Sequence, residues 1–211
     1  MTPESRLGDV LERVIRQRMR DEHVSRIALI DDGSPESKLL RRILGPRLEP
    51  ETLINVSHDP QLLDSLLHGL GPDYGKDDVA AATLSLRARL VEDSIAASPL
   101  NKTALLLGGS LPAEPILPLG DVYASEVEQL SGDWSAPEAV RELARLSGGI
   151  VELDRILGRW AEGRESDWAA GQPASVRDAI GKALATGRAS RISNHVVPKL
   201  GRRTLTVDLT E

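Results

Sequence analysis

The chain has 211 residues, of which 40% are hydrophobic and 27% charged, so it is long enough for one globular domain with a sizeable core. It contains no cysteine, which excludes disulfides, thiolate metal sites and cysteine nucleophiles. A net charge of −6 without a basic stripe argues against general nucleic-acid binding. With no Phe, three Trp and two Tyr, the core must be mostly aliphatic, and base-stacking surfaces are not expected.

The sequence predicts a protein that does not enter a membrane. No apolar run approaches about 18 residues, the length that a spanning helix needs. The N-terminal stretch MTPESRLGDV lacks a charged segment followed by an apolar one, so it does not resemble a signal peptide. We therefore expect a cytoplasmic protein.

The first half of the chain alternates helical and strand patterns. A helix start at Thr2-Pro3 and apolar residues at helical spacing predict the first helix. The expected elements are, in order, a helix over 3–20, a strand over Arg26–Ile30, a helix over 37–44, a strand over Thr52–Ser57, a helix from Asp59-Pro60, a helix over 77–97 and a strand over Lys102–Leu107.

The second half is mostly helical. A proline-rich segment, Leu111–Gly120, precedes helices expected near 122–130, 136–146, 150–161 and 173–186, and Arg203–Leu209 alternates like an edge strand. The whole pattern predicts one α/β domain over 1–211, with a parallel sheet covered by helices on both faces in 1–120 and a helical part with a C-terminal tail in 121–211. Ligands of such sheets bind at the carboxyl ends of the strands, here Asp31–Ser37, Ser57–Asp59 and Gly108–Glu114.

The stretch DDGSPES, Asp31–Ser37, has two interpretations. A loop that enters a helix offers backbone N–H groups to an anion, with Ser34 and Ser37 as further donors and Glu36 or Asp32 for Mg²⁺. Alternatively it is a capped turn, with Ser34 as N-cap and Pro35 in the first helical position. The loop has a single glycine and three acids, so its local residues favour the cap.

Three other segments are candidates for binding. The glycines of LLLGGSLPAE permit close approach to a ligand or form an ordinary turn. In PLGDVYASEV, Asp121 is expected to cap a helix that begins at Val122. The tail brings His195 and Lys199 close to two arginines, which could bind phosphates or form a solvated basic tail. No histidine–carboxylate metal site and no hydrolase triad is apparent, and catalytic residues stay unassigned.

The order of these segments resembles the synthetase domain of NAD synthetase, an N-type ATP pyrophosphatase. The family's loop Ser-Gly-Gly-x-Asp-Ser is similar to residues 32–37, and its Ala-Arg-x-Arg-Met helix is similar to TLSLRARL with Arg87 and Arg89. Its Gly-Thr-Gly-Asn-x-Ser-Glu is placed on LGGSLPAE, which keeps Gly108 and Glu114. Its Pro-Ile/Leu-Gly-Asp-Leu-Tyr-Lys-x-x-Val closely resembles Pro118–Val127, and further resemblances are ELDRIL and the tail PKLGRRT.

This resemblance implies an adenine-nucleotide alpha-hydrolase-like fold and, in most members, a homodimer. Family members adenylate deamido-NAD with ATP and Mg²⁺, and ammonia then displaces AMP. Carried over by position, the ATP and phosphate residues would be Gly33, Ser34, Ser37, Arg89 and Gly108. Glu36 and Glu114 would hold Mg²⁺, and His195 and Lys199 would contact the substrate.

The chain also departs from the family pattern. Asp32 replaces the first Ser of the loop, Ser34 replaces its second Gly, and Val196-Val197 replaces a Lys-Arg pair. The family's Gly-Tyr-x-Thr-x-Tyr-Gly-Asp-Gly and Gln-x-Asp-Glu segments are missing. Three hypotheses remain open: an NAD synthetase-like ligase with altered activity, a catalytically silent dimeric or partner protein, and a nucleotide-binding protein without transfer chemistry.

Overall fold

A computed structural model describes residues 2–70, 75–107, 116–133, 136, 138–161 and 168–187. In these residues the elements are α1 (Pro3–Asp21), β1 (Arg26–Asp31), α2 (Pro35–Leu44), β2 (Leu53–Ser57), α3 (Pro60–Leu70), α4 (Lys76–Arg89), β3 (Ser94–Ala97), α5 (Lys102–Leu106), α6 (Ala124–Ser131), α7 (Glu138–Ser147), α8 (Ile150–Ala161) and α9 (Ala174–Gly187). No helix of the described residues is both long and apolar enough to cross a membrane.

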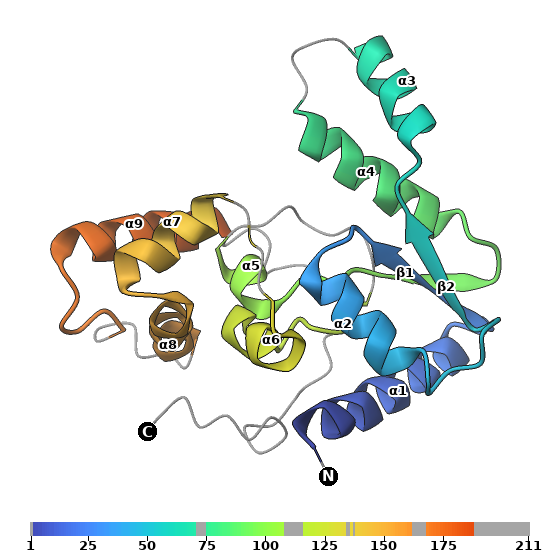
Figure 1. The fold of residues 1–211 in the computed structure, drawn as a ribbon, viewed down its shortest axis with the longest axis horizontal. Coiled ribbons are helices and arrows are strands. Elements are labelled where there is room, and N and C mark those ends of the chain that lie inside the picture. Colours follow the sequence, from blue (N-terminus) through green and yellow to red (C-terminus); the bar gives the residue numbers. More distant parts are fainter. Residues whose placement is uncertain are drawn as a thin grey trace.

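The sheet is parallel with the strand order β2-β1-β3, so β1 is central (Figure 1). Alternate residues of β1 point to opposite faces. Ile27 and Leu29 pack with α1 and α2, whereas Ala28 and Ile30 pack with Leu84 and Ala88 of α4. Helices therefore cover both faces, which confirms the predicted α/β fold class.

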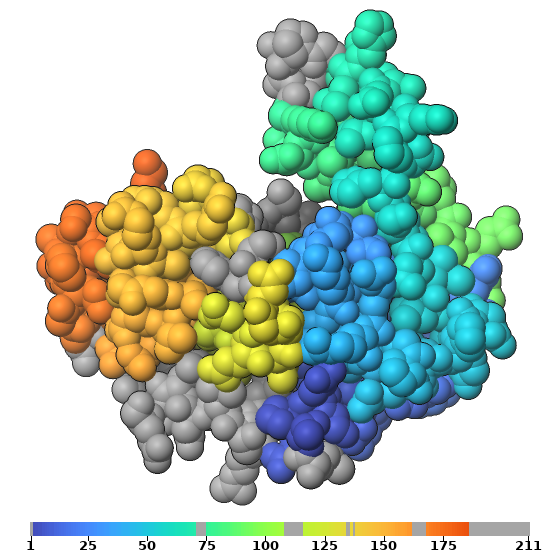
Figure 2. Space-filling model, viewed as in Figure 1, coloured from blue at the N-terminus to red at the C-terminus, as the bar shows by residue number. Residues whose placement is uncertain are grey.

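A second hydrophobic cluster joins α5 to the C-terminal helices. In Figure 1 these helices lie beside the sheet. The cluster includes Leu106 and Leu107 from α5 and its cap, together with side chains of α7, α8 and α9. The C-terminal part of α4 packs on the sheet, whereas α3 and the start of α4 project from the rest of the molecule (Figure 2). The predicted division at residue 120 stays a prediction.

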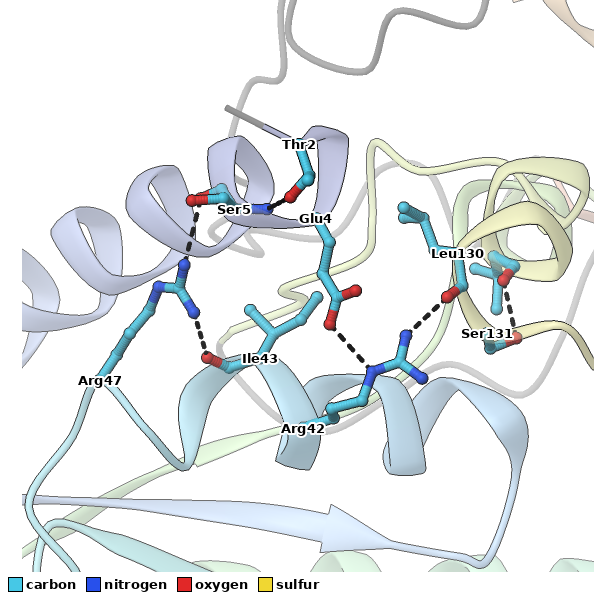
Figure 3. Close-up of polar contacts among 9 residues, drawn as sticks. Thr2, Glu4, Ser5, Arg42, Ile43, Arg47, Leu130 and Ser131 are labelled. Carbon is cyan, nitrogen blue, oxygen red and sulfur yellow. Dashed lines mark hydrogen bonds and ion pairs between the residues drawn. The ribbon is translucent and has the colours of Figure 1, made fainter.

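The helices α1, α2 and α6 are linked by arginines (Figure 3). Arg42 of α2 donates to Glu4 Oε1 at 2.9 Å and to the Leu130 carbonyl of α6 at 2.6 Å. Arg47, just after α2, donates to the Ile43 carbonyl at 2.8 Å. The two bonds of Arg42 therefore tie α6 to α1 and α2.

Two predicted elements are wrong. The helix expected over 77–97 ends at Arg89, and Ser94–Ala97 is the third strand. The segment Lys102–Leu107, expected as that strand, is the short helix α5. Between helix and strand, Asp93 has a positive φ of 53°, and its carboxylate accepts from the N–H of Ser25, 68 residues earlier. This tertiary turn overrides the helical propensity of the alanines in β3.

Candidate functional site

The loop of the DDGSPES stretch lies at the carboxyl end of β1, between the ends of β2 and β3. Gly33 has a φ of +80°, and a Cβ placed there would meet no atom within 4 Å. Position 33 therefore favours glycine because of its left-handed backbone conformation, and not because neighbouring atoms leave no room for a side chain. The loop leads directly into the first turn of α2. The sequence allowed two interpretations of this loop, an anion-binding site or a capped helix start.

The structure confirms the capped turn. Ser34 is the N-cap of α2, its hydroxyl accepts from the Ser37 N–H at 3.1 Å, and Pro35 occupies the first helical position. Ser37 is fully buried, and its hydroxyl donates to the Ser34 carbonyl at 2.9 Å and to Asp31 Oδ1 at 3.1 Å. Both serines are thus engaged within the loop.

Carboxylates of the chain accept from the backbone N–H groups of the loop. Asp31 Oδ1 accepts from the Gly33 N–H at 3.3 Å, and Asp32 Oδ1 accepts from the Ser34 N–H at 3.0 Å. Arg41 of α2 pairs with the other oxygen of Asp31 at 2.9 Å. Pro35, which follows Ser34, has no N–H to offer. The donors that would face a pyrophosphate here are therefore directed to side chains of the same loop.

Glu36 is buried in the first turn of α2, where it is 6% exposed. Its Oε1 accepts from Asn101 Nδ2 at 2.7 Å, while Asn101 Oδ1 accepts from the Ala104 N–H and so caps α5. Burial raises the pKa of Glu36, and the Asp32 carboxylate acts in the same direction, although hydrogen bonds to the Glu36 carboxylate oppose the rise. This contact ties the loop after β1 to the loop after β3.

Asn101 is a site residue that sequence reasoning missed. Asn is a preferred N-cap residue, which is a signal, but the strand predicted over Lys102–Leu107 leaves Asn101 as the residue before a strand. With β3 at Ser94–Ala97, Asn101 is instead the N-cap of α5.

The remaining predicted site residues are not brought to this loop by any described contact. Arg89 is exposed in the last turn of α4. Its neighbour Arg87 reaches the carboxyl end of β2, where it donates to the Ser57 carbonyl. The predicted residues Gly108, Glu114, His195 and Lys199 lie outside the described residues. The structure thus places Gly33, Ser34, Glu36 and Ser37 together.

We tested whether these residues fit the nucleotide and metal that the resemblance implies. A phosphate group would need the N–H groups of Gly33 and Ser34, which already donate to carboxylates. Within the described ranges, no group of three or more His, Asp or Glu side chains is placed to hold a metal ion. In this conformation the N–H groups of Gly33 and Ser34 are therefore engaged by carboxylates of the loop and are not free for a phosphate.

The PLGDVYASEV segment forms a second polar region, between α5, α6 and α8. The helix begins at Ala124 with Tyr123 as N-cap, so the predicted start at Val122 is wrong. Asp121, expected as the cap, instead pairs with Lys102 Nζ at 3.0 Å. The capping contact comes from Glu126, whose Oε2 accepts from the Tyr123 N–H at 2.7 Å.

Comparisons with known proteins give a structural match only. No family model and no curated protein matches the sequence. Among solved structures, the fold is similar to the NH3-dependent NAD synthetase from Campylobacter jejuni in complex with the nitrate ion, with a TM-score of 0.65 and 13% identity. The match covers 92% of this chain and 98% of that chain. The chain therefore has a distantly NAD synthetase-like α/β fold.

Proposed function

We propose that this protein is a distant relative of the NAD synthetases that no longer acts as a ligase and serves as a binding or partner protein on the same fold. One observation carries the proposal: the loop after β1 is closed by its own carboxylates. Asp31 and Asp32 accept from the N–H groups of Gly33 and Ser34. A pyrophosphate would have to displace both carboxylates and would meet their negative charges at close range.

The second candidate is a ligase with altered activity, and Glu36 favours it. The resembling family has an acid at this position of the loop, and here a carboxylate remains in the first turn of α2. On this reading ATP, Mg²⁺, deamido-NAD and ammonia would be the ligands. The roles of Arg89, Gly108, Glu114, His195 and Lys199 would follow from the resemblance alone. The closed loop and the bond from Asn101 to Glu36 weigh against this candidate.

A turnover assay separates the two candidates. The full chain is incubated at high concentration with ATP, Mg²⁺, deamido-NAD and ammonia, and AMP is quantified. We expect no AMP above the level of a control without protein. Formation of AMP and pyrophosphate that saturates with deamido-NAD, and that is lost in Glu36→Ala, would contradict the proposal and favour the altered ligase.

The resemblance also leads us to propose a homodimer. From the net charge of −6 without a basic stripe we propose that the protein does not bind nucleic acid, and a cytoplasmic location stays a proposal. Sedimentation equilibrium of the full chain tests the dimer directly, because a monomer and a dimer differ twofold in mass. A single species at 22.8 kDa across micromolar concentrations would contradict the dimer without affecting the argument about the loop.

A further inference from the structure

A buried polar cluster lies where the sheet half meets the C-terminal helices. Asp154 of α8 is 1% exposed, and its Oδ1 accepts from the Thr103 hydroxyl of α5 at 2.5 Å. Its Oδ2 accepts from the Ser125 N–H of α6 at 2.8 Å. The Thr103 hydroxyl in turn accepts from the Ala124 N–H at 2.9 Å. Three helices are thus joined at the N-terminus of α6.

Helix α6 contributes side chains to two hydrophobic clusters, the one that covers a face of the sheet and the one of the C-terminal helices. Val127 of α6 packs in the cluster that covers one face of the sheet, whereas Ala124 packs in the cluster of the C-terminal helices. The polar cluster therefore lies at the point where these two bodies of apolar side chains meet. A change in the charge of the polar cluster would therefore alter how strongly the two hydrophobic clusters are held together.

The charges around Glu126 are unbalanced. Its carboxylate accepts from the Tyr123 N–H, and the nearby charges that act on it are those of Lys102 of α5, Asp121 of the preceding turn and Asp154 of α8, with the Tyr123 hydroxyl also near. Lys102 is the one cation among them, and its Nζ lies 3.0 Å from Asp121 and 4.6 Å from the Tyr123 ring centroid. From α2, Arg42 contacts the Leu130 carbonyl at the other end of α6. On α8, Arg155 pairs with Glu152. Among the described groups that act on Glu126, one cation therefore accompanies two further carboxylates.

We propose that this cluster is a proton-sensitive joint, in which uptake of one proton by Glu126 strengthens the attachment of the C-terminal helices to the sheet half. The neutral carboxyl keeps an oxygen that can accept from the Tyr123 N–H and no longer repels Asp121 and Asp154. Loss of the proton leaves a partly buried charge beside two others.

Burial, the largest cause, raises the pKa of Glu126 from 4.5 to about 7, and the nearby Asp154 carboxylate adds to the rise. A carboxyl whose pKa is higher in the folded than in the unfolded chain stabilises the fold most below its unfolded pKa. This contribution is lost as the pH rises from about 4.5 to about 7, and above that it stays constant. Neutral pH lies at the upper end of this range.

The experiment compares the wild-type chain with Glu126→Gln and with Glu128→Gln, an exposed glutamate two residues away on α6. Gln can keep the capping contact but cannot titrate. All three tryptophans, at 134, 160 and 168, lie in the second half of the chain, so their fluorescence reports on that half during urea unfolding. Circular dichroism reports on the whole chain. Because the wild type and Glu126→Gln differ in this one titrating group, the difference between their pH profiles isolates Glu126.

We expect the fluorescence-detected unfolding constant of the wild type to rise, relative to Glu126→Gln, by on the order of 100-fold between pH 5 and pH 8. Glu128→Gln should follow the wild type. Parallel pH profiles of wild type and Glu126→Gln would overturn the proposal. If Glu126→Gln does not fold, Asp121→Asn provides the test. Removing this neighbouring charge should move the pH range over which the unfolding constant rises to lower pH than in the wild type. The same pH range in both proteins would overturn the proposal.

Discussion

Individual carboxylate side chains, from the exposed Asp32 to the buried Asp154, accept from backbone N–H groups near helix N-termini of this chain. In the loop after β1, Asp31 and Asp32 occupy N–H groups that would otherwise be free, and Glu36 is bonded to Asn101. In the second polar region the Asp154 carboxyl group accepts from the Ser125 N–H at the N-terminus of α6. In both places a side chain of the protein sits at a helix N-terminus, where a positive dipole end favours negative charge.

Replacing Asp154 with alanine tests this role at the scale of one residue. The substitution leaves the Thr103 hydroxyl and the Ser125 N–H without their acceptor in a buried site. We expect a loss of about 3 kcal/mol in the free energy of unfolding, measured by urea denaturation at pH 7. Asp178→Ala on α9, where the side chain is exposed, is the matched control and should change stability by less than about 0.5 kcal/mol. Equal losses in both variants would contradict the assigned role.

At the scale of elements, the sequence predicted most helices and the first two strands, because long periodic segments and clear caps define them. The Ser34 cap was readable from Ser-Pro-Glu-Ser alone and is confirmed. The third strand was not readable, since SIAA is four residues long and its alanines favour helix as much as strand. This segment is a strand because it pairs with β1 in the sheet. The misplaced strand also hid Asn101, and the partner of Glu36 could not be found.

Asn101 links two elements, so its removal should cost more than a surface cap. In Asn101→Ala, α5 loses its N-cap and the buried Glu36 loses its hydrogen-bond donor. We expect a loss of about 2–4 kcal/mol in the free energy of unfolding at pH 7. Asn55→Ala, at an exposed position of β2, is the control and should cost far less. The double variant Asn101→Ala/Glu36→Gln gives a further contrast. It should recover part of the free energy of unfolding that Asn101→Ala loses, because the amide of Gln carries no charge to bury. No recovery would mean that the bond between Asn101 and Glu36 contributes little.

At the scale of the whole molecule, the fold is similar to that of an NAD synthetase, while the loop after β1 is bonded to its own carboxylates. The similarity to an NAD synthetase extends over 92% of the chain at 13% identity, so the arrangement of elements persists where the residues have diverged. Packing positions such as Leu119 and Val122 are fully buried and belong to the PLGDVYASEV segment, the strongest family resemblance. Selection for packing and selection for a phosphate site are separable, and a fold alone does not determine activity.

The most direct measurement is thermal unfolding of the full chain with and without millimolar ATP–Mg²⁺. A ligand present at about 100 times its Kd stabilises a protein by about 2.7 kcal/mol, which moves the Tm by several degrees. We predict no such shift for the wild type. Asp32→Ser, which frees the Ser34 N–H and removes a charge, should gain a shift that the control Asp178→Ser lacks. A shift of several degrees in the wild type would contradict the account, because the loop would then bind nucleotide despite its own carboxylates.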